Sequence, residues 1–150
     1  MNVTGIILAG GRSARMGEEK GLFNLKGEPM IAHVIRNLEK VVDEIIIIAN
    51  NDGYQRFGFP VYADIVTEKG PVGGIYTGLF HSSTEVNICI SCDVPFVSSQ
   101  FLRWLLSCAS VSAVTLPKFN DNVHQLIGVY KKSAVPIFEE NIDKDKLKLS

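Results

Sequence analysis

Glycines and basic residues gather near the N-terminus, in a segment whose composition suits the binding of a polyphosphate. The segment reads Ile6-Ile7-Leu8-Ala9-Gly10-Gly11-Arg12-Ser13-Ala14-Arg15-Met16-Gly17-Glu18-Glu19-Lys20. Adjacent glycines permit a tight turn and let backbone N–H groups come close to an anion. Two arginines and a lysine add positive charge that can neutralise phosphates. A loop of this kind after a first strand is where open α/β sheets bind nucleotides.

This loop matches neither of the two common phosphate-binding fingerprints. The chain contains no G-x-x-x-x-G-K-[ST] and no G-x-G-x-x-G. Its pattern is instead L-A-G-G-x-S-x-R-M-G-x-x-K. A bare Gly-Gly pair would be typical of an ordinary connecting loop, whereas the full pattern favours a phosphate-binding role.

Three further polar residues follow strand-like runs. Asp93 comes directly after the apolar run 86–92, where a carboxylate would face the ligand crevice of a parallel sheet and could hold Mg²⁺. The alternative role for Asp93 is a charge at the start of the next helix. Asp64 could be a second contact to metal or base, although alone it is typical of a turn. Asn50 could contact a base or ribose, but asparagine is also common in turns.

The elements that must position these residues alternate along the chain. Runs typical of strands occupy six ranges: Val3–Ala9, Glu44–Ala49, Val61–Tyr62, Val86–Cys92, Ser112–Leu116 and Leu126–Tyr130. Helical patterns fall between them. Nearly continuous apolar runs indicate strands that are buried on both faces. The sequence therefore predicts a three-layer α/β/α fold with a mostly parallel, Rossmann-like sheet.

Four helices are expected. The first spans Pro29–Lys40, with proline in its first turn. The second spans Gly74–Ser82, after a break at Gly70–Gly74. Ser98 is expected to cap the third and Ser133 the fourth. In the third helix we expect Trp104 to pack, and in the fourth Ile137 and Phe138 to be included.

The overall composition limits the classes of function. The chain has 150 residues, which suits a single domain over 1–150, and a net charge of −1. That charge provides no general attraction to nucleic acid or acidic lipid. A secretory signal is not expected, and the longest uncharged apolar run, Ile45–Ala49, is too short to cross a bilayer. We therefore expect a cytoplasmic protein without membrane or nucleic-acid partners.

The remaining reactive residues favour packing over chemistry. Cys89 and Cys92 form a C-x-x-C pair, but residues three apart in a strand point to opposite faces. With Cys108 the set is odd in number, and free thiols in a reducing compartment are expected. His33 is expected to be a partly buried helix residue, whereas His124 could line the crevice. No catalytic Ser/His/Asp or Cys/His set is indicated.

Together these motifs resemble the molybdenum cofactor guanylyltransferases, within the nucleotidyltransferases of the nucleotide-diphospho-sugar transferase fold. The matching segments cover nearly the whole chain: Leu8–Gly17 with Lys20, Ala49-Asn50, Asp64, Gly70–Ile75, Cys92–Phe96 and His124–Tyr130. Gly10-Gly11 in place of Ala-Gly is similar to the guanine-using branch. The first and fifth segments are specific to the superfamily.

The resemblance implies transfer of GMP from Mg·GTP to the molybdenum-bound molybdopterin cofactor, with release of pyrophosphate. It implies nucleotide contacts by Leu8, Ala9, Gly10, Gly11, Lys20, Asn50 and Asp64, and contacts to both GTP and Mg²⁺ by Asp93. Arg15 and Lys20 would neutralise charge on the departing pyrophosphate. The attacking phosphate is already anionic, so a strong general base is not required. Proteins that insert molybdenum or chaperone molybdoenzymes would be partners.

One departure from the family pattern leaves alternatives open. The family continues to an Asn-x-Asn-Thr-Pro segment that helps to form the cofactor site, and this sequence does not contain it. We therefore expect the domain to lack, or not to show, its C-terminal segment. The alternatives are a cytidylyl- or sugar-phosphate nucleotidyltransferase of the same superfamily, or a non-catalytic nucleotide-binding adaptor.

Overall fold

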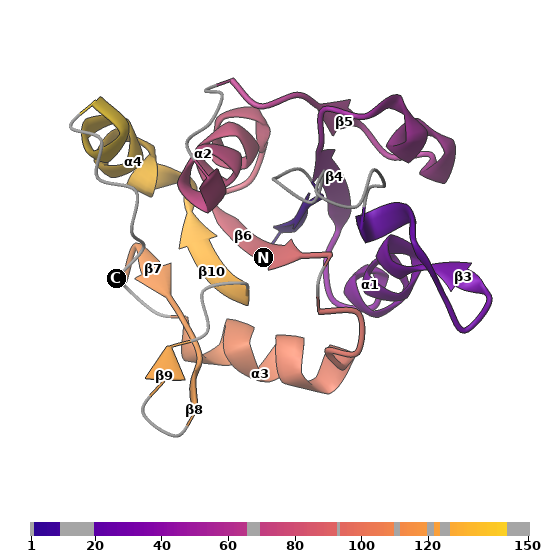
Figure 1. Ribbon diagram of the computed structural model, residues 1–150. Helices are drawn as coiled ribbons and strands as arrows, with labels where there is room; N and C mark the ends of the chain where they lie inside the picture. Colours follow the sequence, from indigo (N-terminus) through magenta and orange to yellow (C-terminus); the bar gives the residue numbers. More distant parts are fainter. Residues whose placement is uncertain are drawn as a thin grey trace.

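The chain folds around a six-stranded sheet (Figure 1). The computed structural model describes residues 2–9, 20–65, 70–92, 94–109, 112–119, 122–123 and 127–143. The strand order is β5-β4-β1-β6-β10-β7. The strands are β1 (Val3–Leu8), β4 (Glu44–Ile48), β5 (Val61–Tyr62), β6 (Val86–Ser91), β7 (Val114–Thr115) and β10 (Ile127–Lys131). Neighbours from β5 to β6 are parallel, and β10 is antiparallel to both β6 and β7.

Helices and short turns connect these strands. The α-helices are α1 (Met30–Glu39), α2 (Gly70–His81), α3 (Ser99–Cys108) and α4 (Val135–Asp143). The 3₁₀ turns are η2 (Lys20–Leu22), η3 (Asp52–Phe57) and η4 (Lys132–Ala134). Two small hairpins pair β2 (Asn24–Leu25) with β3 (Glu28–Pro29), and β8 (Lys118–Phe119) with β9 (Asn122–Val123).

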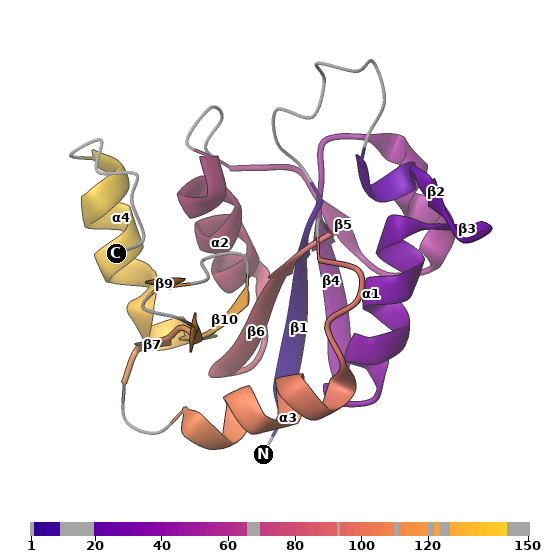
Figure 2. The same ribbon diagram turned by 60° about the horizontal axis from the view of Figure 1, so that its bottom comes forward.

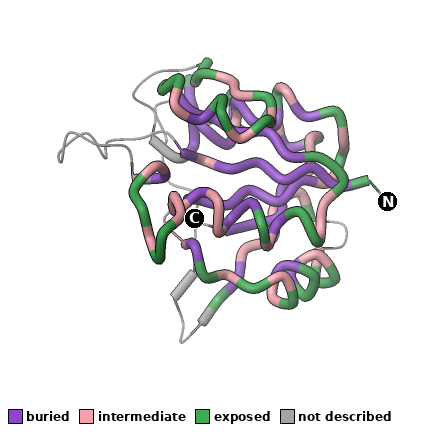
Figure 3. Tube along the Cα trace, turned by 90° about the vertical axis from the view of Figure 1, so that its right-hand side faces the viewer, coloured by how far each residue is buried: buried purple, intermediate pink, exposed green. Residues whose placement is uncertain are grey.

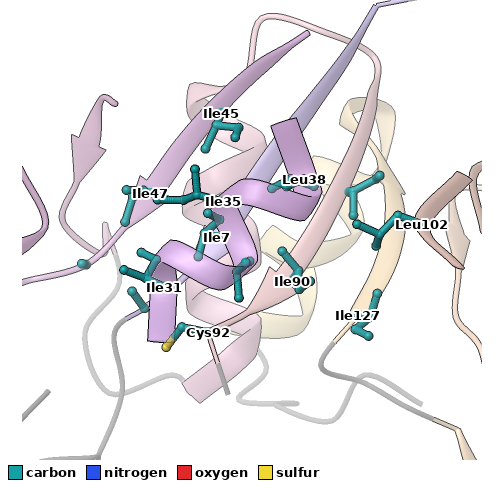
Figure 4. Close-up of a cluster of buried hydrophobic side chains, with 14 of the residues drawn as sticks. Ile7, Ile31, Ile35, Leu38, Ile45, Ile47, Ile90, Cys92, Leu102 and Ile127 are labelled. Atoms are coloured by element: carbon teal, nitrogen blue, oxygen red, sulfur yellow. The ribbon is translucent and has the colours of Figure 1, made fainter. Parts of the chain in front are cut away.

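The helices cover both faces of the sheet, as Figure 2 shows. One buried cluster combines alternate strand residues with α1 and α3, including Ile7, Ile31 and Leu102 (Figure 4). A second cluster on the opposite face joins Ile6 of β1 to α2 and α4. Burial is concentrated along the strands and the inner sides of the helices (Figure 3). The predicted three-layer, mostly parallel α/β/α fold is confirmed.

The start of α2 differs from the prediction. The glycine-rich segment was expected to interrupt the chain before a helix at Gly74, but it forms the first turn of a helix that begins at Gly70. Proline at position 71 is compatible with this turn, because its fixed φ suits the start of a helix and the missing N–H has no helical partner there. The prediction of a break at Gly70–Gly74 was therefore wrong.

Two expectations about α3 and α4 also need correction. Trp104 was expected to pack inside, yet it is 53% exposed. The neighbouring Leu102 and Leu105 are buried, and the rotation of the helix turns Trp104 away from them toward the outside. Ser133 does not cap α4, since it lies within η4 and its backbone N–H donates to Glu85. Ser98 does cap α3, with its hydroxyl accepting from the N–H of Phe101.

The cysteines agree with a packing role. Cys89 and Cys92 are both buried and belong to the clusters on opposite faces of the sheet, as predicted. Burial raises the pKa of the Cys89 thiol well above its usual range, which keeps it protonated and unreactive. None of the three cysteines, all of them in the described ranges, forms a disulfide. In the described part of the chain, no helix has the length and apolar character needed to span a membrane.

Candidate functional site

The ends of the three central strands are level with one another. Leu8 is in register with Ile48 on one side and with Ser91 on the other. Backbone hydrogen bonds continue one residue further, from Ala9 N–H to the Ile48 carbonyl (3.0 Å) and from Cys92 N–H to the Leu8 carbonyl (3.2 Å). The segments that follow β1, β4 and β6 therefore leave the sheet at the same edge. In open parallel sheets this carboxyl edge is the ligand-binding edge.

Asn50 and Asp64 form a two-way pair at this edge. The Asp64 backbone N–H donates to Asn50 Oδ1 (3.0 Å), and Asn50 Nδ2 donates to Asp64 Oδ2 (3.4 Å). The residues are 14 apart in sequence and meet because β4 and β5 are adjacent parallel strands. The side chain of Asn51, in contrast, accepts from Gly53 N–H and has the turn-forming role. Asn50 thus holds Asp64 in place.

The second carboxylate oxygen of Asp64, Oδ1, differs from the first in its hydrogen bonding. Oδ1 is buried and lacks a hydrogen-bond partner among the described residues. This burial raises the pKa of the Asp64 carboxyl, while the hydrogen bond from Asn50 opposes the rise. A buried acceptor without a donor is costly unless a ligand or solvent satisfies it. The oxygen is therefore suited to accept a hydrogen bond from a ligand.

The first turns of α2 pack beside Asp64 and Leu8. A Cβ atom at Gly74 would lie 3.2 Å from Leu8 Cδ2 and 3.7 Å from Asp64 Oδ1. The fully buried Thr77 fixes the same segment, since its hydroxyl accepts from Ile65 N–H (3.0 Å) and donates to the Gly73 carbonyl (2.9 Å). The partial positive charge of the α2 N-terminus adds to the electrostatics of this edge.

The structure brings together part of the predicted site. Leu8 ends β1 and is half-buried, and Ala9 is buried directly after it. Lys20 is the first residue of η2. Gly10, Gly11, Arg15 and Asp93, like Arg12 and His124, lie outside the described residues. Within the described ranges, no three His, Cys, Asp or Glu residues gather as a metal cluster.

Sequence reasoning missed a buried tyrosine at this edge. Tyr54 is 0% exposed, and its hydroxyl donates to the Ala9 carbonyl at 3.3 Å. It lies in η3, a mainly polar turn whose other aromatic residue, Phe57, follows three positions later. The sequence signal was this pair of aromatic residues in a mainly polar segment shortly after Asn50.

Solved structures with this fold define the class of protein. The chain aligns with a crystal structure of an Aquifex aeolicus protein at a TM-score of 0.81 and 31% identity, covering 97% of this chain and 78% of the other. It aligns with the structure titled molybdopterin-guanine dinucleotide biosynthesis protein A from Archaeoglobus fulgidus at a TM-score of 0.80 and 22% identity, covering 97% and 76%. The fold is the nucleotide-diphospho-sugar transferase fold, and this fold defines the class of protein.

The sequence places the chain within this class. It belongs to the family of the MobA-like NTP transferase domain, whose model matches residues 5–149. A relative from Flavobacterium johnsoniae, named "Probable molybdenum cofactor guanylyltransferase", is 38% identical over 98% of this chain and 78% of its own length. A relative of the same name from Carboxydothermus hydrogenoformans is 34% identical, covering 99% and 75%. The resemblance inferred from the motifs is confirmed.

Proposed function

We propose that this protein transfers GMP from Mg·GTP to the terminal phosphate of molybdenum-bound molybdopterin. An oxygen of the acceptor phosphate forms a bond to the α-phosphorus of GTP, and the bond from that phosphorus to the pyrophosphate breaks. The products are the guanine dinucleotide cofactor and pyrophosphate. Support comes from the family, from the names of the relatives and from the polar edge of the sheet.

The observation that carries the choice of nucleotide is the buried Oδ1 of Asp64, which has no hydrogen-bond partner among the described residues. The Watson–Crick edge of guanine presents two donors, N1–H and N2–H, whereas that of cytosine presents one. A carboxylate accepts hydrogen bonds and donates none, so it complements the donors of guanine. Asn50 holds the carboxylate by its other oxygen and leaves Oδ1 for the base. We therefore place Asp64 at the guanine, with Leu8, Ala9 and Gly10 beside the nucleotide.

The remaining proposed roles concern the phosphates. Lys20 and Arg15 bind the triphosphate and neutralise charge on the departing pyrophosphate, while Gly11 permits the backbone to approach it. Asp93 holds Mg²⁺, for which a carboxylate oxygen is a suitable ligand. Its position in the sequence fits, since the preceding Cys92 is hydrogen-bonded to Leu8 at the same edge. When bound, Mg²⁺ polarises the α-phosphate and neutralises the developing charge.

The nucleotide preference gives the direct test. We expect calorimetry to show that Mg·GTP binds at least about tenfold more tightly than Mg·CTP, a difference of about 1.4 kcal/mol. We also expect GTP and loaded molybdopterin to release pyrophosphate. A preference for CTP of the same size would instead support a cytidylyltransferase. Nucleotide binding without pyrophosphate release by the full-length protein would indicate a non-catalytic adaptor.

Substituting Asp64 by asparagine should remove the guanine preference. The amide keeps the size of the side chain, but it loses the charge and one acceptor oxygen. We expect GTP affinity to fall by about tenfold, as for the loss of a charge-assisted hydrogen bond of about 1.5 kcal/mol, with CTP affinity little changed.

GTP binding is also expected to depend on pH, because Asp64 titrates with a pKa raised by burial. Since burial raises the pKa of Asp64, protonation should weaken GTP binding at a pH above the ordinary aspartate range. The wild-type protein should lose affinity as the pH falls through that raised pKa, and Asp64→Asn should lack this component. Calorimetric titrations of both proteins over a pH series measure the difference. Identical pH profiles would exclude Asp64 from base recognition.

A further inference from the structure

We infer that Tyr54 is a positioning residue that fixes both ends of the glycine-rich segment against the sheet. This inference rests on the proposed function, because it assigns the segment a role in GTP binding. It adds a residue that holds the backbone at Ala9 and Gly21 and need not touch the nucleotide.

The first contact is with the end of β1. The Tyr54 hydroxyl donates to the carbonyl of Ala9, the residue that directly precedes Gly10. The tyrosine is fully buried, so its ring cannot swing into solvent. The turn that carries it is fixed by Asn51, whose side chain accepts from Gly53 N–H at 2.7 Å. The segment after β4 therefore supplies both Asn50 and the residue that holds Ala9.

The second contact is with the far end of the segment. A Cβ atom at Gly21 would lie 2.6 Å from Tyr54 Oη and 2.9 Å from Tyr54 Cε1. These distances are shorter than Cβ atoms show in proteins, so only glycine lets the backbone of η2 come this close to the ring. Lys20 is the preceding residue. One side chain thus packs against the backbone on both sides of residues 10–19.

The same glycine also lies against the end of β6. A Cβ atom at Gly21 would be 3.2 Å from Cys92 Sγ, and Cys92 directly precedes Asp93 in the sequence. Tyr54, Gly21 and Cys92 therefore join the three segments that carry the proposed nucleotide ligands. A phenylalanine would fill the same core volume, so the hydroxyl is the part of Tyr54 that core packing alone does not require.

The test removes the hydroxyl and measures Mg·GTP binding by calorimetry. We expect Tyr54→Phe to raise the Kd about fivefold, the factor that matches one hydrogen bond of about 1 kcal/mol, with stoichiometry unchanged. The matched control is Tyr76→Phe, because Tyr76 also donates one hydrogen bond, to Glu139, between α2 and α4. The Kd of Tyr76→Phe for Mg·GTP should equal that of the wild-type protein.

A second variant tests the close approach itself. Gly21→Ala should raise the Kd about tenfold, because the new methyl group must displace either η2 or the buried ring. In Tyr54→Phe/Gly21→Ala the nearest obstructing atom is absent, so the combined effect should be smaller than the product of the single effects. Strictly multiplicative effects would contradict contact between these two residues as the cause.

The outcomes separate this inference from the proposed function. If the wild-type protein does not bind Mg·GTP, the proposed function fails. If the wild-type protein binds and Tyr54→Phe binds equally well, the positioning role is overturned. A lower stoichiometry with unchanged Kd would also overturn it, since that result reports a loss of folded protein rather than a displaced site.

Discussion

Replacing Asp93 by alanine should reduce pyrophosphate release by about 10³-fold or more while leaving the fold intact. The proposed carboxylate ligand of Mg²⁺ would be lost, and with it several kcal/mol of stabilisation of the transition state. The measurement is the initial rate of pyrophosphate release from GTP with loaded molybdopterin. Denaturant unfolding should give the same free energy for the variant and the wild-type protein.

The matched control is Asp143→Ala. Asp143 is an exposed carboxylate at the end of α4 and has no part in the proposed site. Its removal should change the rate by less than twofold, because Asp143 is an exposed residue outside the proposed site. Wild-type turnover by the Asp93 variant would remove this residue from the mechanism, whereas loss of turnover together with unfolding would assign it a structural role.

The carboxyl edge was predictable from the sequence because strongly apolar runs fix where the central strands end. Ile45–Ile48 and Ile88–Ile90 are buried on both faces, and this is the burial expected of central parallel strands. Once the sheet is parallel, polar residues directly after such runs must meet at one edge. The placement of Leu8, Ala9 and Asn50 followed from that rule.

The contacts within the edge could not be predicted in the same way. Asn50 meets Asp64 because β4 pairs with the two-residue strand β5 in a particular register, and so short a strand carries little sequence signal. Tyr54 is buried by tertiary packing, although its turn is mainly polar in sequence. The helical start at Gly70 was missed because glycine and proline weaken helix propensity locally, whereas packing of α2 on β1 outweighs that weakness.

The largest expected effect on stability is that of a substitution at Gly78, where α2 packs on β1. A Cβ atom there would lie 2.5 Å from Ile6 Cγ2 and 3.0 Å from Ile6 Cδ1. Ile6 is fully buried in a central strand, and its branched side chain is stiff, so it cannot move aside. Alanine normally stabilises a helix by about 1 kcal/mol relative to glycine. We nevertheless expect Gly78→Ala to lower the free energy of unfolding by about 2 kcal/mol, because overpacking dominates.

Gly74→Ala provides the comparison within the same helix, one turn earlier. Its new methyl group would meet Leu8 Cδ2 at 3.2 Å, and this atom is the end of a flexible, half-buried side chain that can shift. We expect a change in the free energy of unfolding of less than about 0.5 kcal/mol, since helix propensity offsets the contact. Urea unfolding of both variants measures the difference. Equal stabilities would mean that α2 can move away from β1. Packing of α2 would then not hold Asp64 and Leu8 in fixed positions.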